Sequence, residues 1–212
     1  VEEVGLLHEA RKHSGGITAI VRTDVCVFSC SHDWQILRWS VHAPYNTEGC
    51  VGSHALGVRC MLVTPRYLVT GSDDSEIKCW PFQPLDKPCT LSGHASSVVT
   101  LCYHRGLLWS GSDDGNLRLW DIDGGSGGVS SKKCVQVLTP HTTQVTTITP
   151  LDNTMYTCDK AGNILVWDLS RAAELTQRQS SSVSTSSFSI SALQRHNDEH
   201  DGGSGGGIAG SP

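Results

Sequence analysis

The stretch Ser110–Asp121 has the sequence SGSDDGNLRLWD, and the pair Gly93-His94 lies upstream of it. It places a polar turn of Asp, Asp, Gly and Asn between two short β-prone runs, the second of which ends in Trp120. Two such runs joined by a tight polar turn predict a β-hairpin. The tryptophan gives a fixed point from which the chain can be searched for further copies.

Three other tryptophans stand at matching positions. A His stands 26 residues before each one, a Ser or Thr ten before it, and an aliphatic residue three before it. An Asp stands six before in three copies, whereas Ala161 takes that place in the last. So many ungapped matches indicate four copies of a unit of ~40 residues. The marker residues, with spacings of 41, 40 and 47, are Trp39, Trp80, Trp120 and Trp167.

Each copy is expected to form four antiparallel strands, as in one blade of a β-propeller. The first three strands of the copies fall within residues 17–40, 58–81, 98–122 and 145–169. The last copy lacks a fourth strand of its own, which the N-terminal segment Val4–Glu9 can supply in a closed ring. A short strand around Phe188–Leu193 stays open as an alternative.

With these motifs the sequence resembles the WD40-repeat family over about residues 6–169. The Trp-Asp pair itself occurs at Trp120-Asp121 and Trp167-Asp168. The resemblance implies an all-β propeller with four four-stranded antiparallel blades. Because the family usually has seven blades, which need about 280 to 315 residues, these blades are expected to form part of a seven-bladed ring.

The chain divides into two regions by composition. Residues 1–170 are expected to form the propeller segment, with a flexible Gly/Ser insert at 123–131 between two strands of the third blade. Residues 171–212 are rich in Ser and Gly and predict a disordered tail.

The recurring His, Ser or Thr, and Asp invite comparison with a catalytic triad. A catalytic site is normally built once, whereas this set recurs and accepts Thr for Ser, so a structural hydrogen-bond network is favoured. In the last copy Ala161 cannot contribute, and Asp159 or Lys160 are the alternatives. The tetrads that the resemblance implies are His13, Ser29, Asp33 and Trp39; His54, Thr70, Asp74 and Trp80; His94, Ser110, Asp114 and Trp120; and the incomplete set His141, Thr157 and Trp167.

The resemblance also implies a binding face, made of the loops before each first strand and the turns between second and third strands. Trp34 stands in such a turn, where the other copies have Ser75, Gly115 and Gly162. It can pack on a neighbouring loop, or it can be an exposed anchor for a partner, since Trp is enriched at binding hot spots. The candidate partner-binding residues are Trp34, His32, Arg59, Asp73, Asp113 and Lys160.

Charge and cysteine content limit the partners and the compartment. The net charge of −5 and the lack of a Lys/Arg cluster predict other proteins or peptides as partners and no nucleic acid. No apolar run reaches the ~18 residues of a membrane span, and no cofactor, metal or small-molecule substrate is expected. The nine cysteines contain no Cys-x-x-Cys pair and indicate reduced thiols in an intracellular protein, cytoplasmic or nuclear.

The function expected from these features is a non-enzymatic protein–protein interaction scaffold. The alternative is a targeting domain within a larger multidomain enzyme, such as a ubiquitin-ligase subunit or a kinase.

Overall fold

The computed structural model describes residues 5–83, 85, 87–123, 132–170 and 192–193. Most of the Gly/Ser insert and nearly all of the Ser/Gly-rich tail lie outside these residues. Within them the chain is all-β, in four antiparallel sheets of four strands each, which confirms the predicted fold class. None of the described segments is a helix long and apolar enough to cross a membrane.

Each sheet is one blade, and its strands follow in sequence order across the sheet. Blade 1 contains β1 (Ile17–Arg22), β2 (Cys26–Ser31), β3 (Gln35–Ser40) and β4 (Thr47–Ser53). Blade 2 contains β5 (Val58–Val63), β6 (Tyr67–Ser72), β7 (Ile77–Pro81) and β8 (Cys89–Leu91). Blade 3 contains β9 (Val98–His104), β10 (Leu107–Ser112), β11 (Leu117–Asp121) and β12 (Lys133–Leu138). Blade 4 contains β13 (Val145–Leu151), β14 (Thr154–Asp159), β15 (Ile164–Asp168) and β16 (Ala192–Leu193).

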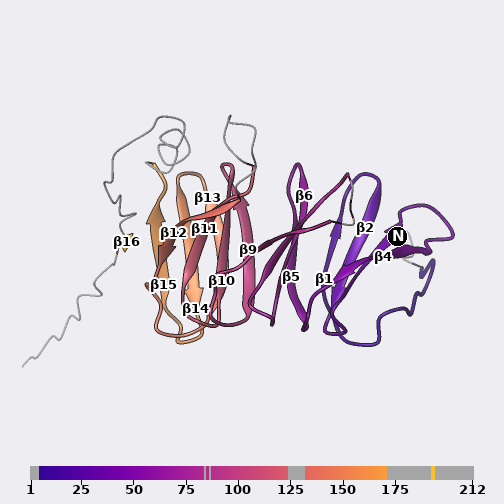
Figure 1. Cartoon of the computed structure of the whole chain (residues 1–212), viewed down its shortest axis with the longest axis horizontal. Coiled ribbons are helices and arrows are strands. Elements are labelled where there is room, and N and C mark those ends of the chain that lie inside the picture. Colours follow the sequence, from indigo (N-terminus) through magenta and orange to yellow (C-terminus); the bar gives the residue numbers. More distant parts are fainter. Residues whose placement is uncertain (1–4, 84, 86, 124–131, 171–191, 194–212) are drawn as a thin grey trace, which may run out of the picture.

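Blade 4 differs from the sequence-based expectation at its outer edge. β16 pairs with β15, Leu193 lying opposite Val166, so the blade has a fourth strand from its own chain. Residues 5–9, which were expected to supply that strand, adopt no strand conformation. The N-terminal segment does not reach β15, because this segment and blade 4 lie at opposite ends of the molecule (Figure 1).

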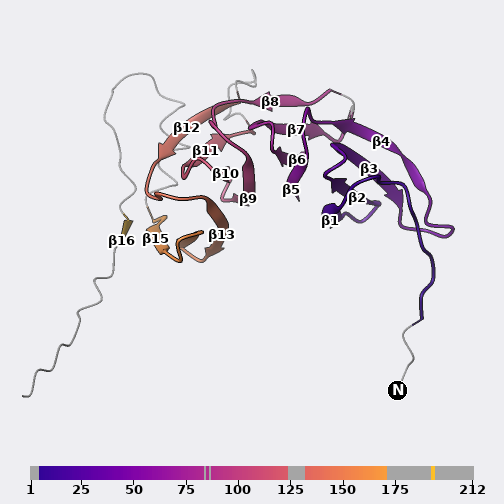
Figure 2. The same cartoon turned by 90° about the horizontal axis from the view of Figure 1, so that it is seen from below.

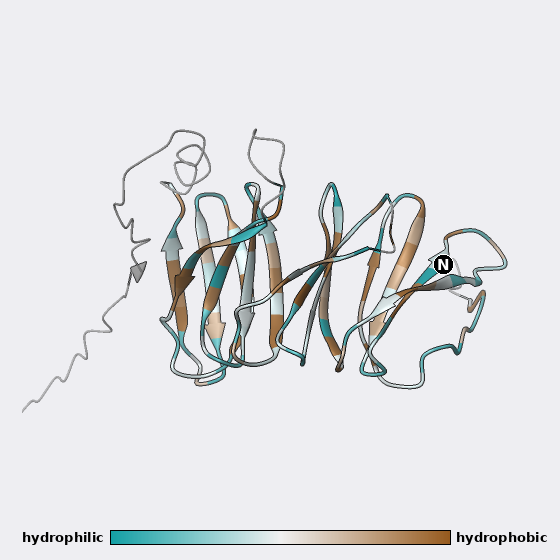
Figure 3. Ribbon diagram, in the orientation of Figure 1, coloured by the Kyte–Doolittle hydropathy of each residue, from teal (hydrophilic) through white to brown (hydrophobic). Residues whose placement is uncertain are grey.

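The four blades follow one another along an open arc (Figure 2). β1, β5, β9 and β13 line the inner side of the arc, and β4, β8 and β12 lie toward its outer side. Apolar stretches occur along strands in all parts of the arc (Figure 3). Three clusters of buried apolar side chains fill the three junctions, so the core is divided among the junctions rather than gathered in one centre.

Small residues allow the blades to approach each other. A Cβ atom on Gly111 in β10 would lie 2.6 Å from the Cγ1 of Val145 in the next blade. A Cβ atom on Gly71 in β6 would lie 2.7 Å from the Cγ1 of Val98. Because real Cβ contacts are longer than this, any larger side chain at these positions would push the neighbouring blade away.

Candidate functional site

The His, hydroxyl, Asp and Trp side chains of blade 2 lie in one hydrogen-bonded chain. His54 Nδ1 is 2.9 Å from Asp74 Oδ2, and His54 Nε2 is 2.8 Å from Thr70 Oγ1. The indole Nε1–H of Trp80 donates to the same Oγ1 at 3.0 Å. We assign the imidazole proton to Nδ1, which faces the carboxylate. Thr70 then donates its hydroxyl proton to Nε2 and accepts from the indole.

The same chain recurs in blades 1 and 3. In blade 1 the separations are His13–Asp33 2.9 Å, His13–Ser29 2.7 Å and Trp39–Ser29 2.8 Å. In blade 3 they are His94–Asp114 3.1 Å, His94–Ser110 2.7 Å and Trp120–Ser110 2.8 Å.

Blade 4 closes its network with a different carboxylate. His141 Nδ1 is 3.0 Å from Asp159 Oδ2 and its Nε2 is 2.9 Å from Thr157 Oγ1, to which Trp167 Nε1–H donates at 2.9 Å. Of the two alternatives for Ala161, the structure therefore brings Asp159 to the imidazole. The Nδ2–H of Asn163 also donates to Asp159 Oδ2 at 2.9 Å. The sequence left Asp159 and Lys160 open, and Asn163, a side-chain donor four residues after Asp159, is the feature that could have favoured Asp159.

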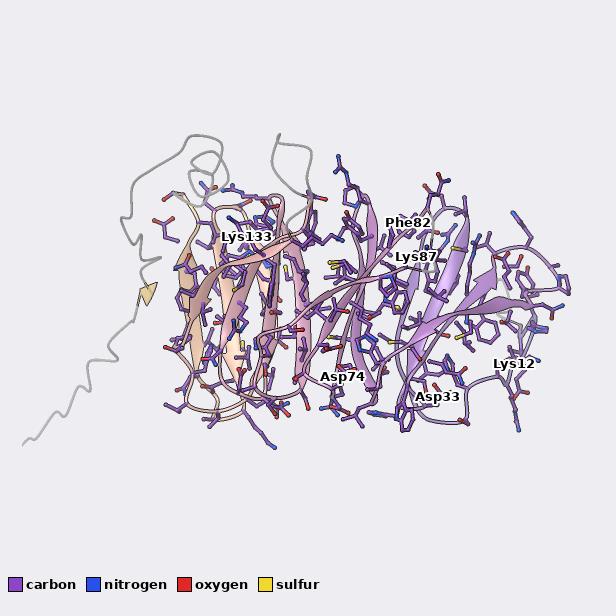
Figure 4. All side chains as sticks on the ribbon, viewed as in Figure 1. Lys12, Asp33, Asp74, Phe82, Lys87 and Lys133 are labelled. Carbon is purple, nitrogen blue, oxygen red and sulfur yellow. The ribbon has the colours of Figure 1, made fainter. Side chains whose placement is uncertain are left out.

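In blades 1, 2 and 3 the carboxylate also ties two loops together through backbone N–H groups. Asp74 Oδ2 accepts the backbone N–H of Ala55, in the loop before the first strand, at 2.9 Å. Its Oδ1 accepts the N–H of Glu76, in the turn between second and third strands, at 3.0 Å. Asp33 and Asp74 occupy the same edge of neighbouring blades (Figure 4). The network thus fixes the loops that form this edge, which we call the lower face.

The burial of these groups argues for a structural role and against a catalytic one. The hydroxyls of Ser29, Thr70, Ser110 and Thr157 belong to fully or almost fully buried residues, so no substrate can reach them as nucleophiles. Burial lowers the pKa of His54 below 6.5, and the carboxylate of Asp74 offsets only part of this effect. A neutral His that already bridges two groups stabilises the blade rather than moving protons.

The carboxylates are held in their charged form. Burial alone would raise the pKa of Asp74, but the backbone N–H groups of Ala55 and Glu76 and the ring of His54 lower it below 3.8. The Asn163 side chain, followed by other hydrogen-bond donors, lowers the pKa of Asp159 to about 2.

We expect the free energy of unfolding to fall in two stages as the solution is acidified. His54 and His94 have lowered pKa values when folded, so their contribution is present above pH 6.5 and is lost below it, where the unfolded chain binds protons. The carboxylates contribute above pH 3.8 and lose their effect as the pH falls toward about 2. Urea midpoints measured at neutral pH, near pH 5 and near pH 3 check this. A midpoint that stays constant over the range contradicts the network.

The candidate partner-binding residues divide into two groups. Four of them share one position, directly after the second strand of each blade, and there each donates its backbone N–H to the loop before the first strand. These bonds are His32 to Gly16 at 3.0 Å, Asp73 to Gly57 at 2.9 Å, Asp113 to Ser97 at 3.0 Å and Lys160 to Gln144 at 2.9 Å. The repeated bond places the four side chains at equivalent points of the lower face.

The other two candidates, Trp34 in blade 1 and Arg59 in blade 2, lie close to this set. Arg59 Nε is 3.5 Å from Asp73 Oδ1, a partly exposed ion pair of small energetic value. A Cβ atom on Gly57 would lie 3.0 Å from both Asp73 Oδ2 and His32 Nδ1, so these two side chains flank the same glycine. The carbonyl of Trp34 accepts the N–H of His54 at 3.0 Å, which links its turn to blade 2.

Trp34 is the most unusual residue of the lower face. Its side chain is 51% exposed, and its φ is 75°, in the left-handed region. Gly115 and Gly162 hold the equivalent turn positions in blades 3 and 4 with φ of 77° and 91°. A bulky residue in this conformation costs roughly 1–2 kcal/mol that glycine does not.

All nine cysteines are free, and Cys50 is the exposed one among them. Among the described residues, no three His, Cys, Asp or Glu side chains are grouped so that they could hold a metal ion.

Comparison with known proteins gives the family. The sequence profile described as "WD domain, G-beta repeat" matches residues 47–81, 86–121 and 132–168, about half of the chain. Together these segments contain β4 to β15, that is, the fourth strand of blade 1, the whole of blades 2 and 3, and the first three strands of blade 4.

Curated relatives are similar to parts of this chain. "WD repeat and FYVE domain-containing protein 2" of Caenorhabditis briggsae is 28% identical over 79% of this chain and 41% of its own length. "Pre-mRNA-splicing factor PRP46" of Candida albicans is 33% identical over 43% of this chain and 22% of its own. "U3 small nucleolar RNA-interacting protein 2" of Homo sapiens is 31% identical over 45% of this chain and 23% of its own. The chain therefore spans less than half the length of each of these relatives.

Solved structures have the same architecture. The computationally designed Ika4 protein matches with a TM-score of 0.67 and 23% identity, over 79% of this chain and 99% of the designed chain. The WD40 repeats of RRP9 match with a TM-score of 0.64 and 26% identity, over 74% of this chain and 49% of that chain.

These comparisons correct one expectation. The prediction that nucleic acid is not among the partners is wrong, because relatives are named for pre-mRNA splicing and for interaction with U3 small nucleolar RNA. The net charge of −5 misled the prediction because it averages over the whole surface and does not describe local contacts.

The expected location and the resemblance to the WD40-repeat family agree with the comparisons. An intracellular location is confirmed, since splicing and small nucleolar RNA, for which the relatives are named, are intracellular. WD40 propellers are generally non-catalytic interaction domains. The repeated network, the four-stranded blades and the matched profile lead to one assignment: the chain belongs to the WD40-repeat family.

Proposed function

We propose that this chain is a non-catalytic interaction scaffold within a ribonucleoprotein assembly, and that it contacts its partner through the lower face around Trp34. The relatives named for splicing and for a small nucleolar RNA support the kind of assembly. The buried tetrads support the absence of catalysis, because their reactive groups are consumed in fixing the loops.

The observation that carries the proposal is the combination of exposure and backbone strain at Trp34. An exposed aromatic residue gains little from packing, and the left-handed backbone costs free energy that Gly115 and Gly162 avoid at the equivalent positions. Residues held in such conformations cluster at binding sites, where the strain serves recognition. Leu56, which is also exposed, lies two residues beyond His54, the residue whose N–H binds the Trp34 carbonyl. An aromatic and an aliphatic side chain are thus available on the same side of the arc.

A second candidate is the targeting domain of a larger multidomain protein. The C. briggsae relative, whose name joins WD repeats to a FYVE domain in one chain, supports this arrangement. The two candidates share the lower face as the contact surface and differ in what else the natural polypeptide carries.

We expect Trp34→Gly to raise the free energy of unfolding by about 1 kcal/mol, because glycine removes the left-handed strain. The same change is expected to weaken partner binding at least about tenfold, since a Trp anchor contributes about 2 kcal/mol or more. The measurements are urea denaturation of the purified protein, and sedimentation of the tagged chain in extracts of its source cells with and without ribonuclease. Leu151→Thr is the control, because Leu151 is also exposed but lies at the other end of β13.

The two possible outcomes test the role of Trp34 and the scaffold function of the chain separately. A Trp34→Gly protein that sediments like the wild type contradicts the role of Trp34. A wild-type chain that sediments alone in every extract contradicts the scaffold itself.

A further inference from the structure

Two thiols face each other across the outer pair of strands in blade 2. Cys79 in β7 and Cys89 in β8 are directly opposite partners in the antiparallel ladder. Opposite residues lie on the same face of a sheet. Cys79 is a buried member of the apolar cluster between blades 2 and 3, and Cys89 packs against that cluster. Both thiols are free, so this face of the sheet holds two of them side by side.

The pair is a property of this blade and not of the repeat. The equivalent partners are Arg38 and Gly49 in blade 1 and Leu119 and Gln136 in blade 3. In the ladders that the structure describes, each of the other cysteines lies opposite a residue of another type. No general requirement of the blade therefore explains why two cysteines meet here.

The spacing of the two backbones suits a disulfide. The N–H of Phe82 donates to the carbonyl of Arg66 at 3.3 Å, so the backbone polar groups of Phe82 point toward β6. Because these groups alternate in direction along a strand, those of Cys79, three residues earlier, point toward β8. Cys79 and Cys89 thus form a hydrogen-bonded pair, whose Cα atoms lie about 5.5 Å apart. This is also the commonest Cα separation of disulfides, about 5.5–6 Å.

The two Cβ atoms need only a small further approach. Opposite Cβ atoms lie about 4.5–5.5 Å apart, whereas a disulfide joins Cβ atoms about 3.5–4.5 Å apart. β8 can supply this movement because it is only three residues long and forms the outer edge of its sheet. A bond formed under such strain is more easily reduced than an ordinary disulfide, which favours a reversible bond over a permanent one.

The two thiols differ in their access to solvent. Cys79 has no exposed surface, whereas Cys89 is only partly buried. Burial raises the pKa of Cys79 to about 12, although the nearby ammonium of Lys132 favours its thiolate. Cys79 is therefore shielded from reagents in solution, and Cys89 is the thiol that an oxidant reaches first.

We propose that Cys79 and Cys89 form a reversible disulfide when the chain meets oxidised glutathione. The Cys89 sulfur attacks one sulfur of oxidised glutathione, whose S–S bond breaks, and one reduced glutathione leaves with the Cys89 proton. The Cys79 sulfur then attacks the Cys89 sulfur, and the second reduced glutathione leaves with the Cys79 proton. Two protein thiols are thus oxidised while one glutathione disulfide is reduced to two thiols. The new bond fastens the edge strand β8 to β7, beside the junction with blade 3.

The test exposes the purified full chain to buffers with increasing ratios of oxidised to reduced glutathione. The reaction is stopped with acid, the remaining thiols are alkylated, and the digested chain is mapped by mass spectrometry. We expect Cys79 and Cys89 to become joined with the loss of two hydrogen atoms, and to separate again when reduced glutathione is added in excess. Cys50, the exposed thiol opposite Leu37, should carry only a glutathione adduct, which shows that the oxidant is active.

Variants of the three cysteines assign the steps. Cys89→Ser should form no disulfide and should leave Cys79 free, because no reagent reaches the buried thiol. Cys79→Ser should trap Cys89 as its mixed disulfide with glutathione, and Cys79→Ala serves the same purpose if the new hydroxyl disturbs the core. Cys50→Ser is the matched control and should form the disulfide like the wild type.

Three results would each overturn the proposal. The first is a wild-type chain in which Cys89 keeps its glutathione adduct, and the second is one in which Cys89 stays free while Cys50 reacts. The third is a disulfide that joins another pair of cysteines. The readout does not involve the partner contacts of the lower face, so the proposal is independent of the role of Trp34.

Discussion

We expect Trp109→Ala to lower the free energy of unfolding by about 3–5 kcal/mol, the usual cost of removing a buried aromatic side chain. Trp109 lies in β10, is almost completely buried, and belongs to the cluster that joins blades 3 and 4. Its removal leaves a cavity between two sheets that the backbone hydrogen bonds of each sheet keep from collapsing. Chemical denaturation followed by circular dichroism measures the loss.

Two variants of the same structural position serve as controls. Trp109→Phe should cost much less, because Phe28 fills the equivalent position in blade 1. Tyr156→Ala, at the equivalent position of blade 4, should cost less than Trp109→Ala because Tyr156 is only partly buried. Equal losses at Trp109 and Tyr156 would contradict the division of the core into junctions.

We expect Thr70→Val to lower the free energy of unfolding by about 2–5 kcal/mol although the side chain keeps its shape. The Trp80 Nε1–H and the His54 Nε2 atom would both lose their hydrogen-bond partner in a buried site. Each unsatisfied buried group costs about 1–3 kcal/mol. Thr70→Ser is the control, because Ser29 and Ser110 perform the same role in blades 1 and 3. A Thr70→Ser protein as unstable as Thr70→Val would contradict the role of the hydroxyl, because Ser keeps that group.

The repeated columns of the sequence predicted the blades because each column reflects a local requirement. A β-hairpin forms from residues close in sequence, and its turn needs small or polar residues such as Gly115. The same columns located the His, hydroxyl and Trp of every tetrad, since 26 residues separate the His and Trp in all four copies.

The sequence was less informative where a contact joins segments without a fixed spacing. The sequence offered a short strand around Phe188–Leu193 only as an alternative, because β16 lies outside the repeat spacing, and its pairing with β15 is known only from the structure. Asp159 sits two residues away from its expected column, and only the shape of the turn brings its carboxylate to His141. The sequence showed small residues at the positions equivalent to Trp34, and the structure added that all four positions have a left-handed backbone.

By itself, the sequence determined the family, the four repeated blades and the networks of blades 1 to 3, because these depend on local hairpins repeated at a regular spacing. Only the tertiary structure decided which of the repeated aliphatic residues are covered. Ile17 and Val58 occupy the same column and have similar side chains, yet one is 60% exposed and the other completely buried. The difference arises because burial depends on a neighbouring sheet, and the position of a blade in the arc determines whether that neighbour is present.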